Sequence, residues 1–133
     1  MAILIDSDVI IQAERGLFDL NAWLDSLPNE EFKLASITVA ELWHGAERAT
    51  GIHRTRRRLF LQQIFSAFDF VSYGEQAAFE HARIWAELES KGRMIGSYDV
   101  ILAAMAIHTG SAVATFNVRH FAAVRGLKVI QPK

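Results

Sequence analysis

The chain has 133 residues, with 14 lysines and arginines against 15 aspartates and glutamates, and 51% of its residues are hydrophobic. This length suits one domain with a substantial core, so we expect a single domain over residues 1–133. The chain has no cysteine, which excludes a disulfide framework, a thiolate metal site and a catalytic thiol. An early apolar run is interrupted by Asp6 and Asp8 before it is long enough for a signal peptide or a membrane span. We therefore expect a soluble, cytoplasmic protein with no membrane partner.

Short apolar runs alternate with stretches in which apolar residues recur every three or four positions. The runs are typical of buried strands and the longer stretches of helices. In chain order the patterns predict a strand at 2–5, helices at 7–16 and 17–27, a strand at 32–36, helices at 38–49 and 56–68, a strand at 70–71, helices at 74–91 and 97–108, and strands at 112–116 and 127–130. Strands separated by helices need crossover connections and therefore lie parallel. The sequence predicts an α/β fold, a three-layer α/β/α sandwich with a central parallel sheet.

The helix ends and faces can also be predicted. Ser7 or Asp8 is suited to cap the first helix, and Gly16 to end it. The inward-facing residues expected on the two long middle helices are Leu59, Phe60, Ile64 and Phe65 on the first and Phe79, Ala82, Trp85 and Leu88 on the second.

Charge is unevenly distributed along the chain. Residues 1–47 carry nine acids and two bases, residues 48–60 carry five arginines and no acid, and no acid follows Asp99. Arginines clustered beside carboxylates are suited to hold a polyanion while a metal ion neutralises the acids. The same run, HRTRRR, is equally typical of the solvated start of an amphipathic helix. The charge pattern leaves both interpretations open.

Four polar residues fall at one edge of the predicted sheet. Asp6 ends the first strand, Glu41 and Asp99 lie in the first turns of two helices, and Asn117 follows a later strand. Ligands of open α/β sheets bind at the carboxyl ends of the strands, which is this edge. Carboxylates gathered there need a cation, and Mg²⁺ prefers oxygen ligands. The pattern indicates metal-assisted hydrolysis of nucleic acid.

Each of these residues also has a structural interpretation. Thr38 and Glu41 fit a capping box, Asp99 is favourable at a helix N-terminus without any metal, and Asn117 is a common turn residue. Asp6 is harder to explain structurally, because an acid at the end of a buried apolar strand is costly. Their joint position favours the functional interpretation.

Four segments in this order resemble the PIN-domain family, in particular the small ribonuclease toxins of the VapC type from bacterial toxin-antitoxin pairs. The segments are ILIDSDVII at 3–11, ASITVAELWHGAER at 35–48, IGSYDVILAAMA at 95–106 and ATFNVRHF at 114–121. The resemblance implies an endoribonuclease that uses Mg²⁺, or Mn²⁺ as a substitute, bound by Asp6, Glu41 and Asp99. Asn117 stands where the family has a fourth acid or an asparagine, which leaves the catalytic site with one charge fewer.

Further residues are assigned by their position around this site. Ser7 and Thr115 are expected to supply hydroxyls that fix the ligand geometry. Asp8 has two possible roles, at the metal or at the start of the first helix, and we favour the helix. The five histidines form no metal-binding pattern, although His120, three residues after Asn117, merits a test. The arginines expected to contact RNA phosphates are Arg56, Arg57 and Arg93.

The resemblance also implies partners. A VapB-type antitoxin would lay its C-terminal segment across the toxin and block the acidic site, and two copies of the chain would form a homodimer. Trp43 is a candidate antitoxin contact or an ordinary core residue. Two other functions remain open: a haloacid-dehalogenase-type phosphatase with Asp6 as nucleophile and Asp8 as acid/base, and a non-catalytic protein-binding module with the same fold.

Overall fold

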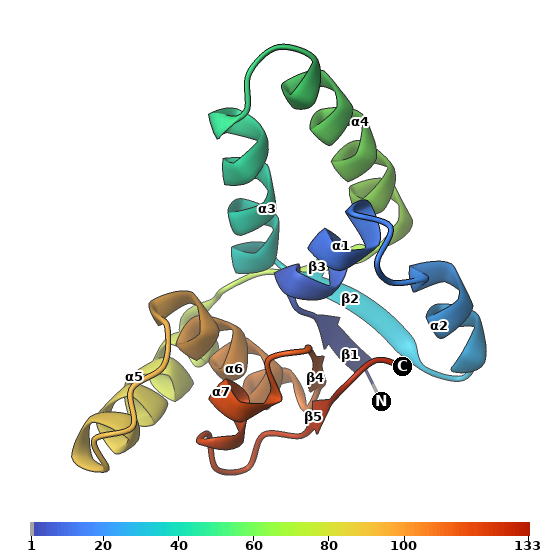
Figure 1. Cartoon of the computed structure of the whole chain (residues 1–133). Coiled ribbons are helices and arrows are strands. Elements are labelled where there is room, and N and C mark those ends of the chain that lie inside the picture. Colours follow the sequence, from blue (N-terminus) through green and yellow to red (C-terminus); the bar gives the residue numbers. More distant parts are fainter. Residues whose placement is uncertain (1) are drawn as a thin grey trace.

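The computed structural model describes residues 2–133 and contains five strands and seven helices in that range. The strands are β1 (Ala2–Ile5), β2 (Glu31–Ala35), β3 (Asp69–Val71), β4 (Ala112–Ala114) and β5 (Val129–Ile130). The helices are α1 (Ser7–Glu14), α2 (Leu20–Ser26), α3 (Ser36–Arg48), α4 (Gly51–Ala67), α5 (Glu75–Ser90), α6 (Ser97–Thr109) and α7 (Val118–Ala122). Figure 1 shows their arrangement.

All strand pairs are parallel, and the strand order is β3-β2-β1-β4-β5. The chain moves outward from β1 in one direction through β2 and β3, and then returns to the other side of β1 with β4. The strand order therefore reverses between β1 and β4. Open α/β sheets bind ligands at such a reversal, outside the carboxyl ends of the strands. Here those ends lead into Asp6 and into residues 115–117.

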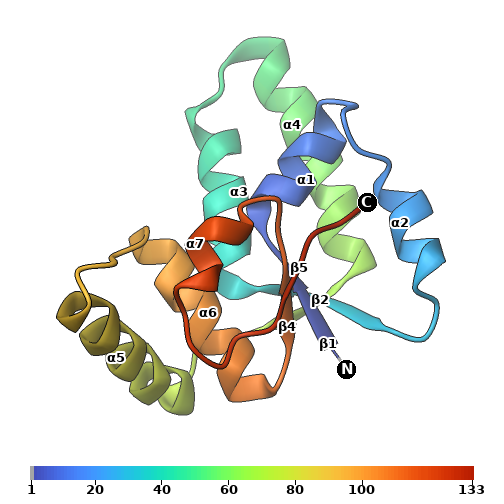
Figure 2. The same cartoon turned by 60° about the horizontal axis from the view of Figure 1, so that its bottom comes forward.

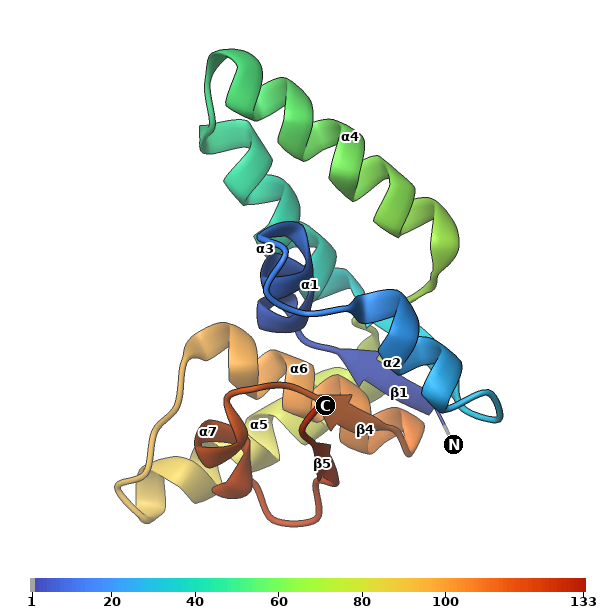
Figure 3. The same cartoon turned by 45° about the vertical axis from the view of Figure 1, so that its right-hand side comes forward.

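Helices cover both faces of the sheet. Alternate side chains of β1 point to opposite sides: Ile3 and Ile5 pack with α1 to α4, and Leu4 packs with α5 to α7. Figures 1 and 2 show these two helical layers. The predicted three-layer α/β/α architecture with a parallel sheet is confirmed. Helices α3 and α4 form a hairpin that extends beyond the sheet (Figure 3).

Several predicted boundaries were wrong. Helix α4 begins at Gly51, five residues before the predicted start, and α2 begins only at Leu20, which leaves Leu17 71% exposed. The last two strands are shorter than predicted, and α7 was not predicted. The cap of α1 is Asp6, not Ser7 or Asp8, because the Asp6 carboxylate accepts the Ser7 N–H. Gly16 does follow the end of α1, with a φ of 72° that suits glycine.

The predicted inward faces of the two long middle helices were partly wrong. In α4, Leu59 is exposed while Leu61 is buried. In α5, Phe79 and Trp85 are exposed, and the buried residues are Ala77, Ile84 and Leu88. Large apolar residues on both sides of α5 made the choice of face ambiguous from periodicity alone. Within residues 2–133, no helix is long and apolar enough to cross a membrane.

Candidate metal centre

Asp6 is held rigidly at the end of the central strand. Its Oδ1 accepts a hydrogen bond from the Ser7 backbone N–H at 2.8 Å, and its Oδ2 accepts one from the Thr115 hydroxyl at 2.8 Å. The residue is only 5% exposed. Burial is the largest cause that raises the pKa of Asp6 to about 6, followed by repulsion from Asp8. An acid with a raised pKa at this edge is a strong candidate for a metal ligand.

Asp8 lies in the first turn of α1, as predicted, but its side chain also reaches the segment after β4. Its Oδ2 accepts hydrogen bonds from the Phe116 backbone N–H at 3.0 Å and from the Thr115 hydroxyl at 3.2 Å. Its Oδ1 is buried and makes no hydrogen bond. Burial raises the pKa of Asp8. The helix role alone does not account for a buried carboxylate oxygen without a donor.

Glu41 lies on α3, and the capping-box interpretation of this residue was wrong. The helix begins at Ser36, so Thr38 is already inside it, and its N-terminus has no side-chain cap. The Thr38 hydroxyl is buried and makes no hydrogen bond. Burial, together with repulsion from Asp6, Asp99 and Asp8, raises the pKa of Glu41 to about 7. The Glu41 carboxylate therefore interacts with those of Asp6, Asp8 and Asp99 at the carboxyl edge of the sheet.

Asp99 enters the same edge from the first turn of α6. Gly96 is the N-cap of this helix and lies close to the Asp99 carboxylate. His120 Nδ1 lies 3.4 Å from the same oxygen and 2.8 Å from the side-chain nitrogen of Asn117. Both contacts use the single ring nitrogen Nδ1, which accepts from the Asn117 amide or, when it carries a proton, donates to Asp99, but does not do both at once. Sequence spacing singled out His120 but gave no sign of this contact.

Four carboxylates, those of Asp6, Asp8, Glu41 and Asp99, therefore share one edge of the sheet. In residues 2–133 no lysine or arginine forms an ion pair with any of them. Nor do three or more acidic or histidine side chains in this range converge tightly enough for a ready-made metal site. Repulsion among like charges opposes such convergence. One buried and three partly buried carboxylates, an oxygen without a donor, and no lysine or arginine partner in residues 2–133 fit a hard divalent cation, which binds oxygen ligands.

The other predicted residues have different surroundings. Thr115 places its hydroxyl on Asp6 as expected, whereas Ser7 contacts Asp6 through its backbone N–H. Arg93 is exposed in the segment between α5 and α6. Arg57 forms an ion pair with Glu14 at 3.1 Å, and Arg56 lines a hollow beside it. The arginine run is therefore partly committed to contacts within the protein.

Comparison with known proteins places this geometry in context. A PIN-domain model matches residues 3–127. Ribonuclease VapC1 of Rickettsia felis is 30% identical over 98% of this chain and 96% of its own length. The tRNA(fMet)-specific endonuclease VapC of Salmonella typhimurium is 33% identical over 72% of this chain and 71% of its own length. Among solved structures, DNA-bound VapBC from Salmonella typhimurium matches with a TM-score of 0.89 and 26% identity, covering 98% of both chains.

Proposed function

Because the chain belongs to the PIN-domain family and resembles its VapC ribonucleases over nearly its full length, we propose that it is a metal-dependent endoribonuclease and the toxin of a toxin-antitoxin pair. The observation that carries the proposal is the group of four carboxylates at the reversal of strand order, without a lysine or arginine partner in residues 2–133. We further propose one domain over residues 1–133. The phosphatase alternative is set aside because the matching family is a different one.

We propose Mg²⁺ as the cation, with Mn²⁺ as a substitute, and Asp6, Glu41 and Asp99 as its ligands. Bound there, it would neutralise the carboxylates, activate water and stabilise the charge that develops on the phosphodiester. Asp8 is suited to accept a hydrogen bond from a water molecule through its unpartnered Oδ1. Thr115 fixes the rotamer of Asp6 by donating to Oδ2, so that Oδ1 and Oδ2 keep defined directions.

Asn117 and His120 lie beside Asp99 in this proposal. His120 restricts the Asp99 carboxylate when its Nδ1 donates to it, Asn117 positions the His120 ring when Nδ1 accepts instead, and neither residue adds negative charge. The proposed substrate is RNA, because the Rickettsia felis relative is named a ribonuclease. Arg93, Arg56 and Arg57 are the proposed phosphate contacts. Within residues 2–133 Arg57 is paired with Glu14, whereas Arg56 and Arg93 form no ion pair; Arg93, in the segment that leads to the helix carrying Asp99, is the strongest candidate.

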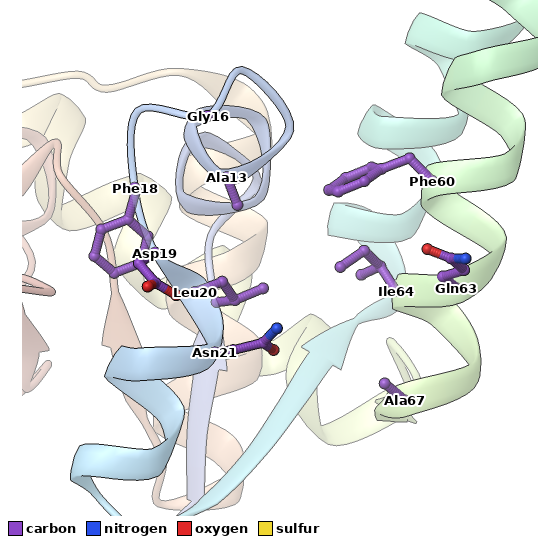
Figure 4. A pocket seen from close by; sticks show the side chains of 10 residues that line it. All are labelled: Ala13, Gly16, Phe18, Asp19, Leu20, Asn21, Phe60, Gln63, Ile64 and Ala67. Carbon is purple, nitrogen blue, oxygen red and sulfur yellow. The ribbon is translucent and has the colours of Figure 1, made fainter.

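The proposed antitoxin is a VapB-type protein, and one groove is suited to receive it. A hollow of about 590 Å³ separates α4 from α1, α2 and the segment between them. Figure 4 shows Phe60 and Ile64 of α4 opposite Phe18 and Leu20 across this hollow. These apolar side chains, bordered by Asp19, Asn21 and Gln63, suit an amphipathic helical or extended peptide. Trp43 does not line the groove: its indole N–H donates to Glu47 on the same helix.

A homodimer is also proposed. Phe79 and Trp85 on α5 and Met94 after it are large and exposed, and His81 and Trp85 border an apolar hollow of about 270 Å³. Exposed apolar residues that border a hollow, as Trp85 and Met94 do here, are typical of contact surfaces between copies of a chain. This surface lies on the α5 side of the sheet, opposite the proposed antitoxin groove.

The test is incubation of the purified protein, freed from any bound partner, with total RNA in Mg²⁺, Mn²⁺ or EDTA. We expect discrete fragments with either metal and none in EDTA. The control is Asp99→Asn, which removes one charge with little change of shape and should abolish the fragments. Initiator tRNA belongs in the substrate panel because it is the substrate named for the Salmonella relative. A folded, metal-binding protein that leaves every RNA intact would favour the non-catalytic module.

A further inference from the structure

A small hollow of about 220 Å³ opens directly beside the candidate metal centre. It is lined by Ile37, Ala40, Glu41 and His44 of α3 and by Tyr98 at the start of α6. Glu41 is one of the four carboxylates described above, and Tyr98 immediately precedes Asp99. Any group that occupies the hollow therefore lies next to the reaction centre.

The walls of the hollow differ from those of a phosphate site. Among its lining residues there is no lysine or arginine, and the one charged side chain is the acid Glu41. A phosphate would meet repulsion there. Ile37 and Ala40 add apolar surface, and Tyr98 adds an aromatic ring that is 54% exposed. These walls suit a flat, uncharged, partly apolar group.

We infer that this hollow binds one nucleobase of the RNA, belonging to a nucleotide that flanks the cleaved phosphate; the inference rests on the proposed ribonuclease function. The base stacks on the Tyr98 ring, and the exposed imidazole of His44 hydrogen-bonds its edge. Aromatic rings are general stacking partners for unpaired bases. The volume is below that of pockets for drug-sized ligands and fits a single heterocycle.

This arrangement assigns specificity to two residues that need not touch the metal. Tyr98 supplies affinity for a base, and His44, whose ring carries both a donor and an acceptor when neutral, supplies selection among bases. Because base-edge contacts carry sequence information and phosphate contacts do not, the hollow rather than the arginines would select the cleavage site.

The first test measures RNA binding in EDTA, so that cleavage does not interfere. The probes are fluorescein-labelled hexamers of adenosine, cytidine, guanosine and uridine, read by fluorescence anisotropy. For the hexamer that binds best, we expect Tyr98→Ala to weaken binding about tenfold and Tyr98→Phe by no more than about twofold, because stacking needs the ring and not the hydroxyl. Tyr73→Ala is the matched control: it truncates the other tyrosine, which is 42% exposed and outside the hollow.

The second test maps the ends of RNA fragments made by the wild type and by His44→Ala in Mn²⁺. A changed base preference at the cut supports the hollow as the specificity site. Unchanged hexamer binding by folded Tyr98→Ala, together with unchanged cleavage sites in His44→Ala, overturns the inference. Altered sedimentation of Tyr98→Ala also overturns it, because the ring would then belong to a contact between copies.

The outcomes separate this inference from the proposed function. If the wild type cleaves no RNA but Tyr98→Ala still loses hexamer binding, the nuclease assignment fails and the base site stands. If the wild type cleaves RNA and neither variant differs from it in binding or cleavage site, the base site fails and the nuclease stands.

Discussion

Two regions of this protein are rich in charged residues. In one, arginines form ion pairs with an acid, and in the other, acids repel one another. In the α3–α4 hairpin, Glu47 accepts hydrogen bonds from Arg54 at 3.0 Å, from Arg58 at 2.8 Å and from the Trp43 indole at 3.1 Å. These partners, with the Arg58 hydrogen bond the largest favourable cause, lower the pKa of Glu47. At the sheet edge, burial and mutual repulsion raise the pKa of Asp6 and Glu41.

The contrast separates structural charge from functional charge. In the hairpin, Glu47 is compensated by arginines of the same chain. The sheet edge pairs none of its acids with a lysine or arginine of residues 2–133, which costs stability. Groups held in an unfavourable electrostatic state are characteristic of functional sites. A cation bound there would relieve the repulsion among the carboxylates, and this relief would add to the free energy of cation binding.

The largest expected effect comes from removing a charge at the sheet edge. Asp6→Asn should lower RNA cleavage by about three orders of magnitude or more, because the metal provides several kcal/mol of charge stabilisation. The measurement is the cleavage rate in saturating Mn²⁺, with metal binding followed by calorimetry. Glu47→Gln, which alters the hairpin instead, should cleave at nearly the wild-type rate. Equal losses of cleavage rate in Asp6→Asn and Glu47→Gln would contradict the assignment of functional charge to the sheet edge alone.

The next effect concerns the support of Asp6. Thr115→Val keeps the shape of a fully buried side chain but removes the hydroxyl that donates to Asp6 Oδ2. We expect metal affinity to fall about 10- to 100-fold and the free energy of unfolding to fall by about 1–2 kcal/mol. Calorimetric Mn²⁺ titration and urea denaturation measure the two quantities. Thr115→Ser, which retains the hydroxyl, should keep most of the metal affinity and most of the free energy of unfolding. If it does not, the losses in Thr115→Val come from altered packing and not from the hydroxyl.

The raised pKa values predict how stability depends on pH. Asp6 and Glu41 bind protons more tightly in the folded state, so their contribution is fully present below pH 4 and is lost as pH rises through about 6 and 7. From pH 5 to pH 8, these groups should lower the free energy of unfolding of the metal-free protein by on the order of 1–2 kcal/mol, after allowance for the partial exposure of Glu41.

A neutral side chain tests that assignment. Glu41→Gln should stabilise the metal-free protein at pH 8 but not at pH 5, and should lose RNA cleavage at both. Urea denaturation at the two pH values, in EDTA, measures the difference. An equal change at both pH values would show that packing, rather than charge, accounts for the effect.

The smallest effect is expected in the hairpin. Glu47 is exposed, so Glu47→Gln should lower thermal stability only slightly, and the difference from the wild type should vanish at 1 M salt, where the Debye length is about 3 Å. Thermal melts at low and high salt give the comparison. A large loss of stability that persists at high salt would show that the ion pairs hold the hairpin together through more than exposed charge.

Much of this fold followed from local patterns. The alternation of apolar strands with helices predicted the parallel sheet, and the central strand Ala2–Ile5 was predicted with its observed bounds. Helix boundaries were less predictable. The polar stretch at the start of α4 carries no apolar pattern, yet it is helical, and its Arg54 contacts Glu47 of the preceding helix. Contacts between distant residues do not appear in a local window.

For the candidate site, the sequence alone determined which acids follow which strands and therefore which edge they share, because parallel strands align their carboxyl ends. Only the tertiary structure decided three further points: that Thr115 and Phe116 bind Asp8 across more than 100 positions of the chain, that Glu41 takes part in no capping box, and that His120 Nδ1 lies within reach of both Asn117 and Asp99. Spacing predicts which edge a residue reaches, whereas hydrogen bonds and electrostatic repulsion depend on distances that exist only once the sheet has brought remote segments together.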